Sequence, residues 1–400
     1  MRRRRAALLL PVLLLAACSG ADRDTASGAG AGAAAGAGSA PATSSAPSRP
    51  SSAPAPSTSP AAPAGPRGGP VPTRFAPLSV SFVSDSTGFA LGGTGCGKPR
   101  CTAVVRTRDA GRTWDGIPAP RTVVADPVEG VSELRFGSPS DGWAFGHELW
   151  STHDGGATWA EVPAARYLAR GPGVLEAAAG TAWLVTDGCE NVEGTCTGRA
   201  QLLRSPVGRD DWAAVDVPLG TTADLVLHGS AVYVVSQAPK SAPVLVASAD
   251  GRRFSRRSLP CREDTRPLLA ASGDLALALL CPGADGEAPG RSRASAFVSS
   301  DGGQHWKRVG DPPVTPFGSS LSATGSGTFL AAPGSGVYVT RDGSRSWQQV
   351  VRPVGRDQGG PTYVGFVTDS FGVTLAPVGG GAAGMGLTRD GGRRWQRVGF

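Results

Sequence analysis

A short motif recurs along the chain and constrains its fold more than any other feature. It has the form Ser/Thr-x-Asp-x-Gly-x-x-Trp, and its clear copies begin at residues 107, 152, 299, 340 and 388, with Ser344 in place of the glycine in the fourth of these. The aspartate can accept hydrogen bonds from its own turn, a glycine supplies a left-handed conformation, and the tryptophan buries a large apolar face. Each copy, called a box below, therefore predicts a β-hairpin corner. Structural roles are expected for Asp109, Trp114, Asp154, Trp159, Asp301, Trp306, Asp342, Trp347, Asp390 and Trp395.

The spacing of the boxes predicts the architecture. Weaker copies run from Ser205 to Trp212 and from Ser248 to Phe254, so that the aromatic positions are separated by 45, 53, 42, 52, 41 and 48 residues. Each interval fits four short strands, which is the size of a propeller blade. We count seven units, at about 74–120, 121–165, 166–219, 220–261, 262–313, 314–353 and 354–400.

The segments between boxes favour strands. Leu78, Val80 and Phe82 alternate with serines, which is typical of a half-buried strand. Long helical periodicity is absent, and 58 glycines and 34 prolines argue against it. The expected fold is an all-β, seven-bladed β-propeller with box hairpins, preceded by a disordered tether. The last unit supplies its own fourth strand, so ring closure does not require an N-terminal strand, although residues 74–76 could add to its edge.

The boxes resemble the Asp-box (BNR) repeat, and the resemblance covers residues 74–400. Similar propellers include six-bladed sialidases and seven-bladed bacterial secreted proteins that resemble photosystem II assembly factors. In such folds the box joins the third and fourth strands, away from the usual ligand face. The resemblance therefore implies that the box aspartates are structural and that ligands bind at the opposite face.

The sialidase resemblance does not extend to the catalytic residues. The Arg-Ile-Pro motif is absent, and Tyr167 with Glu176 is the one close Tyr–Glu spacing, with Glu176 at an expected strand start. Many arginines lie inside the boxes, where His153 and His305 are also expected to decorate turns. We therefore expect a protein that is not an enzyme, with an extracellular glycan hydrolase of sialidase-like type as the alternative.

The N-terminus predicts the compartment. Arg2–Arg5 precede an apolar stretch at residues 6–17, which is too short to cross a bilayer as a helix. Leu15-Ala16-Ala17-Cys18 then matches a bacterial lipobox. Residues 1–17 are expected to be a lipoprotein signal peptide, and Cys18 is expected to carry lipid (diacylglycerol, palmitate) that holds the chain at the extracytoplasmic face of the cell membrane. An ordinary secretory signal with a chance cysteine is the alternative.

Residues 18–73 are expected to form the lipidated cysteine and a tether. They are rich in Ala, Gly, Ser, Thr and Pro and cannot bury a core. As a flexible coil the tether would average roughly 40 Å end to end. Without Arg2–Arg5 the chain has 35 basic and 32 acidic residues, a balance that gives little support to nucleic-acid binding.

The remaining cysteines suit an oxidising compartment. Their even number favours disulfides, and the local spacing suggests pairs 96–101, 189–196 and 261–281 among fifteen connectivities. Metal ligation is the alternative, but neither CxxC spacing nor a nearby histidine supports it. No metal and no cofactor are expected. The cysteines concerned are Cys96, Cys101, Cys189, Cys196, Cys261 and Cys281.

Loops opposite the boxes are the expected binding surface. All six cysteines fall in these segments, and bracing lowers the ordering cost of association. Alternatively, the disulfides serve only to staple insertions. Glu129, Glu133, Glu263 and Asp264 are expected on connectors between blades. The candidate binding residues are Lys98, Arg100, Asp187, Glu190, Asn191, Glu193, Arg199 and Arg291.

The expected function is non-catalytic binding of an envelope protein or a glycan by a monomer attached to the membrane through its N-terminal lipid. An assembly factor for a membrane complex is a third candidate, because the resembling proteins include assembly factors. No nucleic acid is expected as a partner.

Overall fold

The computed structural model describes most of the chain from residue 65 to the C-terminus. Cys18, the predicted signal peptide and most of the predicted tether lie outside the described residues. The described residues form β-strands and no α-helix. Among them there is accordingly no helix long and apolar enough to cross a membrane. The described residues are 65–95, 100–125, 129–163, 173–186, 188, 198–263, 265–272, 275–283, 294–312, 320–324, 327–333, 335–352, 363–376 and 384–400.

The strands form one nine-stranded sheet and five four-stranded sheets. The nine-stranded sheet contains β1 (Ala76–Phe82), β2 (Gly88–Thr94), β3 (Arg100–Thr107), β4 (Asp115–Ile117), β5 (Val123–Val124), β6 (Val131–Phe136), β7 (Gly142–Gly146), β8 (Leu149–Thr152) and β9 (Ala160–Glu161).

Each four-stranded sheet uses consecutive antiparallel strands. They are β10 (Val174–Ala178), β11 (Thr181–Val185), β12 (Leu202–Pro206) and β13 (Ala213–Val215); β14 (Thr222–His228), β15 (Ala231–Gln237), β16 (Val244–Ser248) and β17 (Ser255–Ser258); β18 (Leu268–Ala271), β19 (Leu277–Cys281), β20 (Ser295–Ser299) and β21 (Lys307–Gly310); β22 (Ser320–Thr324), β23 (Thr328–Ala332), β24 (Val337–Thr340) and β25 (Gln348–Val351); and β26 (Tyr363–Phe366), β27 (Gly372–Ala376), β28 (Gly384–Thr388) and β29 (Gln396–Arg397).

The all-β propeller is confirmed, but the prediction of seven separate blades is wrong. Five blades are separate sheets, whereas the first two predicted units are merged. The physical cause is β5, which pairs antiparallel with β3 through Arg100 and Cys101 and parallel with β6 through Val131. This two-residue strand satisfies backbone groups of both neighbours and thereby joins β1–β4 to β6–β9.

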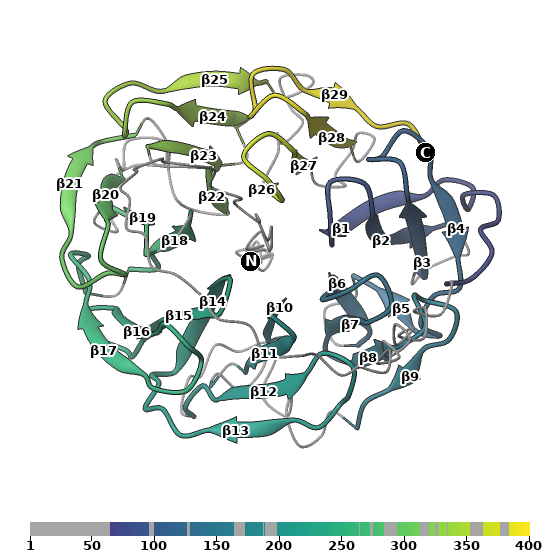
Figure 1. The fold of residues 1–400 in the computed structure, drawn as a ribbon, viewed down its shortest axis with the longest axis horizontal. Helices are drawn as coiled ribbons and strands as arrows, with labels where there is room; N and C mark the ends of the chain where they lie inside the picture. The colour runs from purple at the N-terminus through teal and green to yellow at the C-terminus, as the bar shows by residue number, and fades with distance from the viewer. Residues whose placement is uncertain are drawn as a thin grey trace, which may run out of the picture. The chain divides into compact units, whose positions relative to one another are not determined.

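We call β1–β4, β6–β9 and each four-stranded sheet a group of strands. The groups follow one another around a ring, and the first strand of each group lies innermost (Figure 1). Inner strands are linked by serine hydroxyls that accept from the backbone of the next inner strand: Ser79 from Leu134 at 3.0 Å, Ser81 from Phe136 at 2.9 Å, and Ser320 from Val364 at 2.7 Å. These bonds satisfy N–H groups that no fifth strand pairs.

Ser79 and Ser81 therefore correct the expectation of a half-buried first strand. Both serines are buried, as is Val80 between them, because each face of β1 lies inside the ring. Polar alternation in this strand marks links between inner strands rather than a solvent-facing side.

The core is divided into apolar clusters between neighbouring groups of strands. A box aromatic closes the outer part of each cluster, as when Trp159 meets Phe136 edge-on and Trp212 meets Trp143. Phe254, in the weak box, packs against Trp183 in the same way. The box aromatic therefore packs one group against the group that precedes it.

Ring closure uses packing rather than a shared strand. Phe82 and Val105 from the first strands join Tyr363 and Leu387 of the last sheet in one buried cluster. All four strands of the last sheet come from residues 363–397, and Ala76 begins β1 rather than extending that sheet. The buried part of the closing contact is thus apolar, which gives the ring a seam without strand exchange.

Candidate functional site

The strand order gives the ring two different rims. Because strands within each group are antiparallel, the box turns lie on the same rim as the hairpins between first and second strands. Backbone bonds confirm this placement: the amides of Gly155, Gly302 and Gly391 donate to carbonyls in those hairpins, at 2.8, 2.9 and 3.0 Å. We call this the box rim. The opposite rim carries the starts of the inner strands, the hairpins between second and third strands, and the connectors between groups.

Each box turn is held by its aspartate. In the first box, Asp109 accepts from the Thr113 amide at 2.9 Å and from its hydroxyl at 2.7 Å, while the Thr107 hydroxyl donates to the same carboxylate at 2.9 Å. The Gly111 amide donates to the Thr107 hydroxyl at 2.8 Å, with Gly111 at φ +76°. The corresponding bonds recur around Asp154, Asp301, Asp342 and Asp390.

These bonds favour the ionised carboxylates. The Thr113 backbone bond is the largest cause that lowers the pKa of Asp109 to about 2, and the Ser346 hydroxyl is the largest that lowers the pKa of Asp342 to about 2. A carboxylate whose oxygens are committed to its own turn has little capacity for a ligand. The box aspartates therefore serve the corners.

Arginines tie box turns to neighbouring groups. The acceptor is the backbone carbonyl of the residue at the fourth position of a box. Arg204 donates to the Gly251 carbonyl at 3.3 Å, and Arg341 donates to the Gly391 carbonyl at 3.3 Å. At the seam, Arg389 of the last box donates to the Ala110 carbonyl of the first box. Arg204, Arg341 and Arg389 thus join neighbouring groups through hydrogen bonds to box turns.

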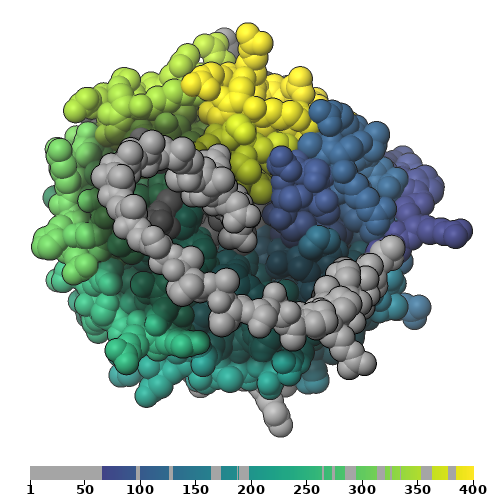
Figure 2. Space-filling view, in the orientation of Figure 1, coloured from purple at the N-terminus to yellow at the C-terminus, as the bar shows by residue number. Residues whose placement is uncertain are grey.

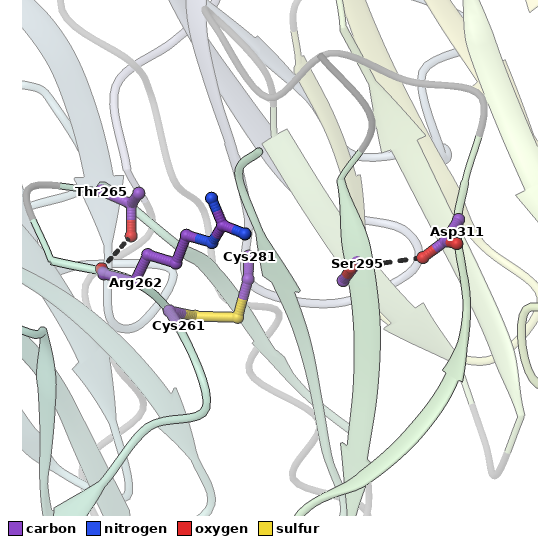
Figure 3. Close-up of a disulfide and its surroundings, with 6 residues drawn as sticks. All are labelled: Cys261, Arg262, Thr265, Cys281, Ser295 and Asp311. Carbon is purple, nitrogen blue, oxygen red and sulfur yellow. Dashed lines mark hydrogen bonds between the residues drawn. A yellow bond between two sulfur atoms is a disulfide. The ribbon is translucent and has the colours of Figure 1, made fainter. Parts of the chain in front are cut away.

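The opposite rim is covalently braced next to β18 and β19. Cys261, in the connector after β17, forms a disulfide with Cys281 at the end of β19, and both cysteines are buried. The exposed Arg262 extends alongside this bridge, and its carbonyl accepts from the Thr265 hydroxyl at 2.7 Å (Figure 3). Cys101 is also disulfide-bonded. The predicted pairs with Cys96 and between Cys189 and Cys196 involve residues outside the described ranges.

A side-chain amide fixes the same connector from the other side. Gln237, at the end of β15, donates to the Thr265 carbonyl at 2.7 Å and accepts from the Thr265 amide at 3.1 Å once its amide is oriented to match. This pair of bonds imitates one step of a β-ladder. The connector is therefore held at Cys261 and at Thr265, while Arg262, Glu263 and Arg266 remain exposed.

The inner strands carry a buried ion pair. Arg135 of β6 donates to Glu176 of β10 at 2.9 Å, and the two side chains are 4% and 0% exposed. The Arg135 Nε also donates to the Leu175 carbonyl at 3.2 Å. Together these bonds link the nine-stranded sheet to the β10–β13 sheet across the inner wall.

Two more acids lie near the starts of inner strands. Glu133 in β6 keeps some exposed surface, yet its carboxyl is surrounded by protein, and this desolvation raises its pKa to about 8. Desolvation likewise raises the pKa of Asp224 in β14 to about 7, against the opposing effects of the Leu225 amide and Arg266. Burial also raises the pKa of Tyr363, and its charged neighbours are Arg135, Glu176 and Glu133.

The structure corrects the expectation that Glu133 lies on a connector, and it places Glu176 near the start of a strand, as expected. Glu133 lies within β6 rather than on a connector, because the inner strand begins at Val131. Glu176 is the third residue of β10, and its carboxylate is buried in the ion pair with Arg135. It is therefore not exposed to a substrate. A glycosidase needs two carboxyl groups that flank the scissile bond, whereas the carboxyl groups of Glu133 and Glu176 are both surrounded by protein.

The described candidate binding residues lie on the opposite rim. Arg100 begins β3 and Arg199 precedes β12, and both are exposed. Glu129 and Glu263 are also exposed. The other candidates, together with Asp264, lie outside the described residues: Lys98, Asp187, Glu190, Asn191, Glu193 and Arg291.

One ionic cluster on the box rim escaped the sequence analysis. His153 lies between Asp141 at 2.9 Å and Asp210 at 3.2 Å, with one ring nitrogen facing each carboxylate. Asp210 also accepts from Trp143 Nε1 at 3.0 Å and from the Ser151 hydroxyl at 2.6 Å. His153 therefore links its own group to the following one rather than merely decorating a turn.

The arrangement of the strands defines a β-propeller, and similar solved structures are propellers too. No protein-family profile and no curated protein sequence matches the chain. The structure described as YCF48 bound to D1 peptide is similar with a TM-score of 0.53 and 19% identity, over 81% of this chain and 96% of that one. YCF48 from Cyanidioschyzon merolae is similar with a TM-score of 0.53 and 16% identity, over 81% and 98%.

A more distant propeller gives the same result. The β-propeller domain of the Trilobed protease from Pyrococcus furiosus is similar with a TM-score of 0.51 and 9% identity, over 82% of this chain and 99% of that one. At these identities the similarity shows the shared fold. One fold hosts many functions, so the similarity extends to the fold alone.

Proposed function

We propose that this chain is an extracytoplasmic lipoprotein that acts as a non-catalytic scaffold and binds a protein partner at the opposite rim. The observation that carries the proposal is the braced connector between β17 and β18. A disulfide and a paired amide hold its backbone, while Arg262, Glu263 and Arg266 on it are exposed. A surface that is ordered before binding loses less entropy on association.

The chemistry of the inner wall favours binding over hydrolysis. Glu176 is fully buried in an ion pair, and the aspartates of the boxes are committed to their turns. The similar structure of YCF48 holds a peptide, which supports a protein rather than a glycan as the partner class. Membership of the Asp-box family, lipid at Cys18 and the disulfide pairs 96–101 and 189–196 belong to the same proposal.

Two variants with equal loss of charge test the proposal. The opposite-rim variant carries Arg100→Gln, Arg199→Gln, Arg262→Gln and Arg266→Gln. The box-rim variant carries Arg252→Gln, Arg253→Gln, Arg345→Gln and Arg394→Gln. All eight arginines are exposed, and among them Arg266 also interacts with the buried carboxyl of Asp224.

The intact protein is cross-linked in cells that make it naturally, extracted in detergent and compared with both variants by mass spectrometry. We expect one stable protein partner, which the opposite-rim variant loses and the box-rim variant keeps. Equal capture by all three proteins, or release of sugar from a glycan panel by the intact protein, would contradict the proposal.

A further inference from the structure

The box rim carries an uneven distribution of charge. From 248 to 258 the β16–β17 turn and strand contain four arginines and one aspartate, and from 388 to 397 the β28–β29 segment contains the same numbers. By contrast, the segment from 204 to 216 has two arginines and three aspartates, and the segment from 152 to 161 has no lysine or arginine. The later groups therefore present a basic arc, and the earlier ones do not.

Arg257, Arg389 and Arg393 in these segments donate their guanidinium groups to backbone carbonyls. The turns hold other arginines of the arc through their backbones. The amides of Arg252 and Arg253 donate to Asp250 at 2.9 and 3.1 Å, and the amide of Arg394 donates to Asp390 at 2.9 Å. Their side chains are exposed, as is that of Arg345 in the box that begins at residue 340, one of the two boxes between these segments. The arc thus displays guanidinium groups on a backbone that is already fixed.

The chain also enters the propeller at the box rim. Gly65 lies against the second box, because a Cβ on Gly155 would be 3.2 Å from the Gly65 Cα. The buried Arg106 donates to the Pro66 carbonyl at 2.7 Å, and Gly69 pairs with Gly116 through two backbone bonds of 2.9 Å. Residues 65–69 are therefore fastened to the outer edge of the first group at the box rim.

From these two observations we propose that the box rim is a membrane-facing surface whose basic arc binds anionic phospholipid headgroups. The inference rests on the proposed function for the lipid at Cys18, which would hold the chain close to a bilayer. Juxtamembrane arginines gain from the negative potential of an anionic leaflet within about 10 Å of its surface. The bound lipid would then direct the braced opposite rim away from the membrane, toward a partner.

Vesicle co-sedimentation tests this surface without any protein partner. The full chain carrying Cys18→Ser, which removes the lipid acceptor, is mixed at low salt with vesicles of phosphatidylglycerol and phosphatidylcholine, or of phosphatidylcholine alone. We expect binding to the anionic vesicles only, and we expect it to fall as salt is raised. Since each basic residue near such a surface contributes a factor of about five, four of them contribute up to about 600-fold, and the box-rim variant should lose at least about tenfold.

The opposite-rim variant is the matched control and should retain binding within about twofold, since its arginines would face away from the bilayer. Equal losses in both variants would mean that net charge alone drives binding and would overturn the assignment of a rim. Undiminished binding by the box-rim variant, salt-independent binding or equal binding to neutral vesicles would overturn it too. The assay contains no partner protein, so a negative result would count against lipid binding only. The proposed scaffold role is tested separately by the cross-linking comparison.

Discussion

Removing one member of the buried Arg135–Glu176 pair should destabilise the propeller strongly. Glu176→Gln keeps the size of the side chain but leaves the Arg135 charge, which is 4% exposed, without its counter-ion at 2.9 Å. Breaking a buried pair in this way costs about 3–5 kcal/mol, because the remaining charge has been desolvated without compensation. Glu133 cannot substitute readily, since burial already raises its pKa to about 8.

Urea unfolding followed by tryptophan fluorescence measures this cost, because the box tryptophans lie between groups. The double variant Arg135→Met with Glu176→Leu should recover most of the loss, since apolar pairs often replace buried ion pairs at little cost. Arg397→Met, at an exposed position in β29, serves as the control and should change stability by less than about 0.5 kcal/mol. A loss below about 1 kcal/mol for Glu176→Gln would refute the reasoning.

Three further predictions concern contacts between groups. Burial lowers the pKa of His153, but hydrogen bonds to Asp141 and Asp210 raise it overall. The stabilisation that protonated His153 gives the fold is therefore complete below the pKa of the unfolded chain and disappears as pH rises through the pKa of the folded protein. The stability difference between the parent and His153→Gln should shrink from pH 5 to pH 9, and a constant difference would contradict this. Replacing Cys261 and Cys281 by serine should cost about 3 kcal/mol in denaturant titrations, because the bond closes a 20-residue separation, and unchanged stability would exclude a bracing role. Arg389→Ala should cost about 1 kcal/mol and increase amide exchange at the seam, since the guanidinium donates to Ala110 and lies over Phe371; exchange that rises equally everywhere would argue against a local link.

The repeat made the architecture predictable because its chemistry is local. Aspartate, glycine and tryptophan within eight residues are sufficient to specify a corner, and regular spacing turns corners into a propeller. The Cys261–Cys281 pairing was similarly accessible, since its partners are close in sequence. By contrast, the merging of the first two units depends on a two-residue strand, β5, whose pairing is set by where a connector comes to lie.

Contacts between groups were not predictable, because they join residues about one repeat apart. Arg135 and Glu176 are 41 residues apart, and neither stands in a motif. Ser79 looked like a solvent-facing residue because alternation cannot distinguish a surface from the face of a neighbouring inner strand. An acid within an inner strand, such as Glu133 or Asp224, is the signal that could have revealed the polar inner wall.

Site-specific photo-cross-linking tests the division between the two rims most directly. A photoreactive residue replaces either Arg262, on the opposite rim, or Arg253, on the box rim, in the intact protein on native membranes. We expect the probe at position 262 to form an adduct with a protein and the probe at position 253 to form one with phospholipid. Protein adducts at 253 with lipid adducts at 262, or the same products from both positions, would contradict the account.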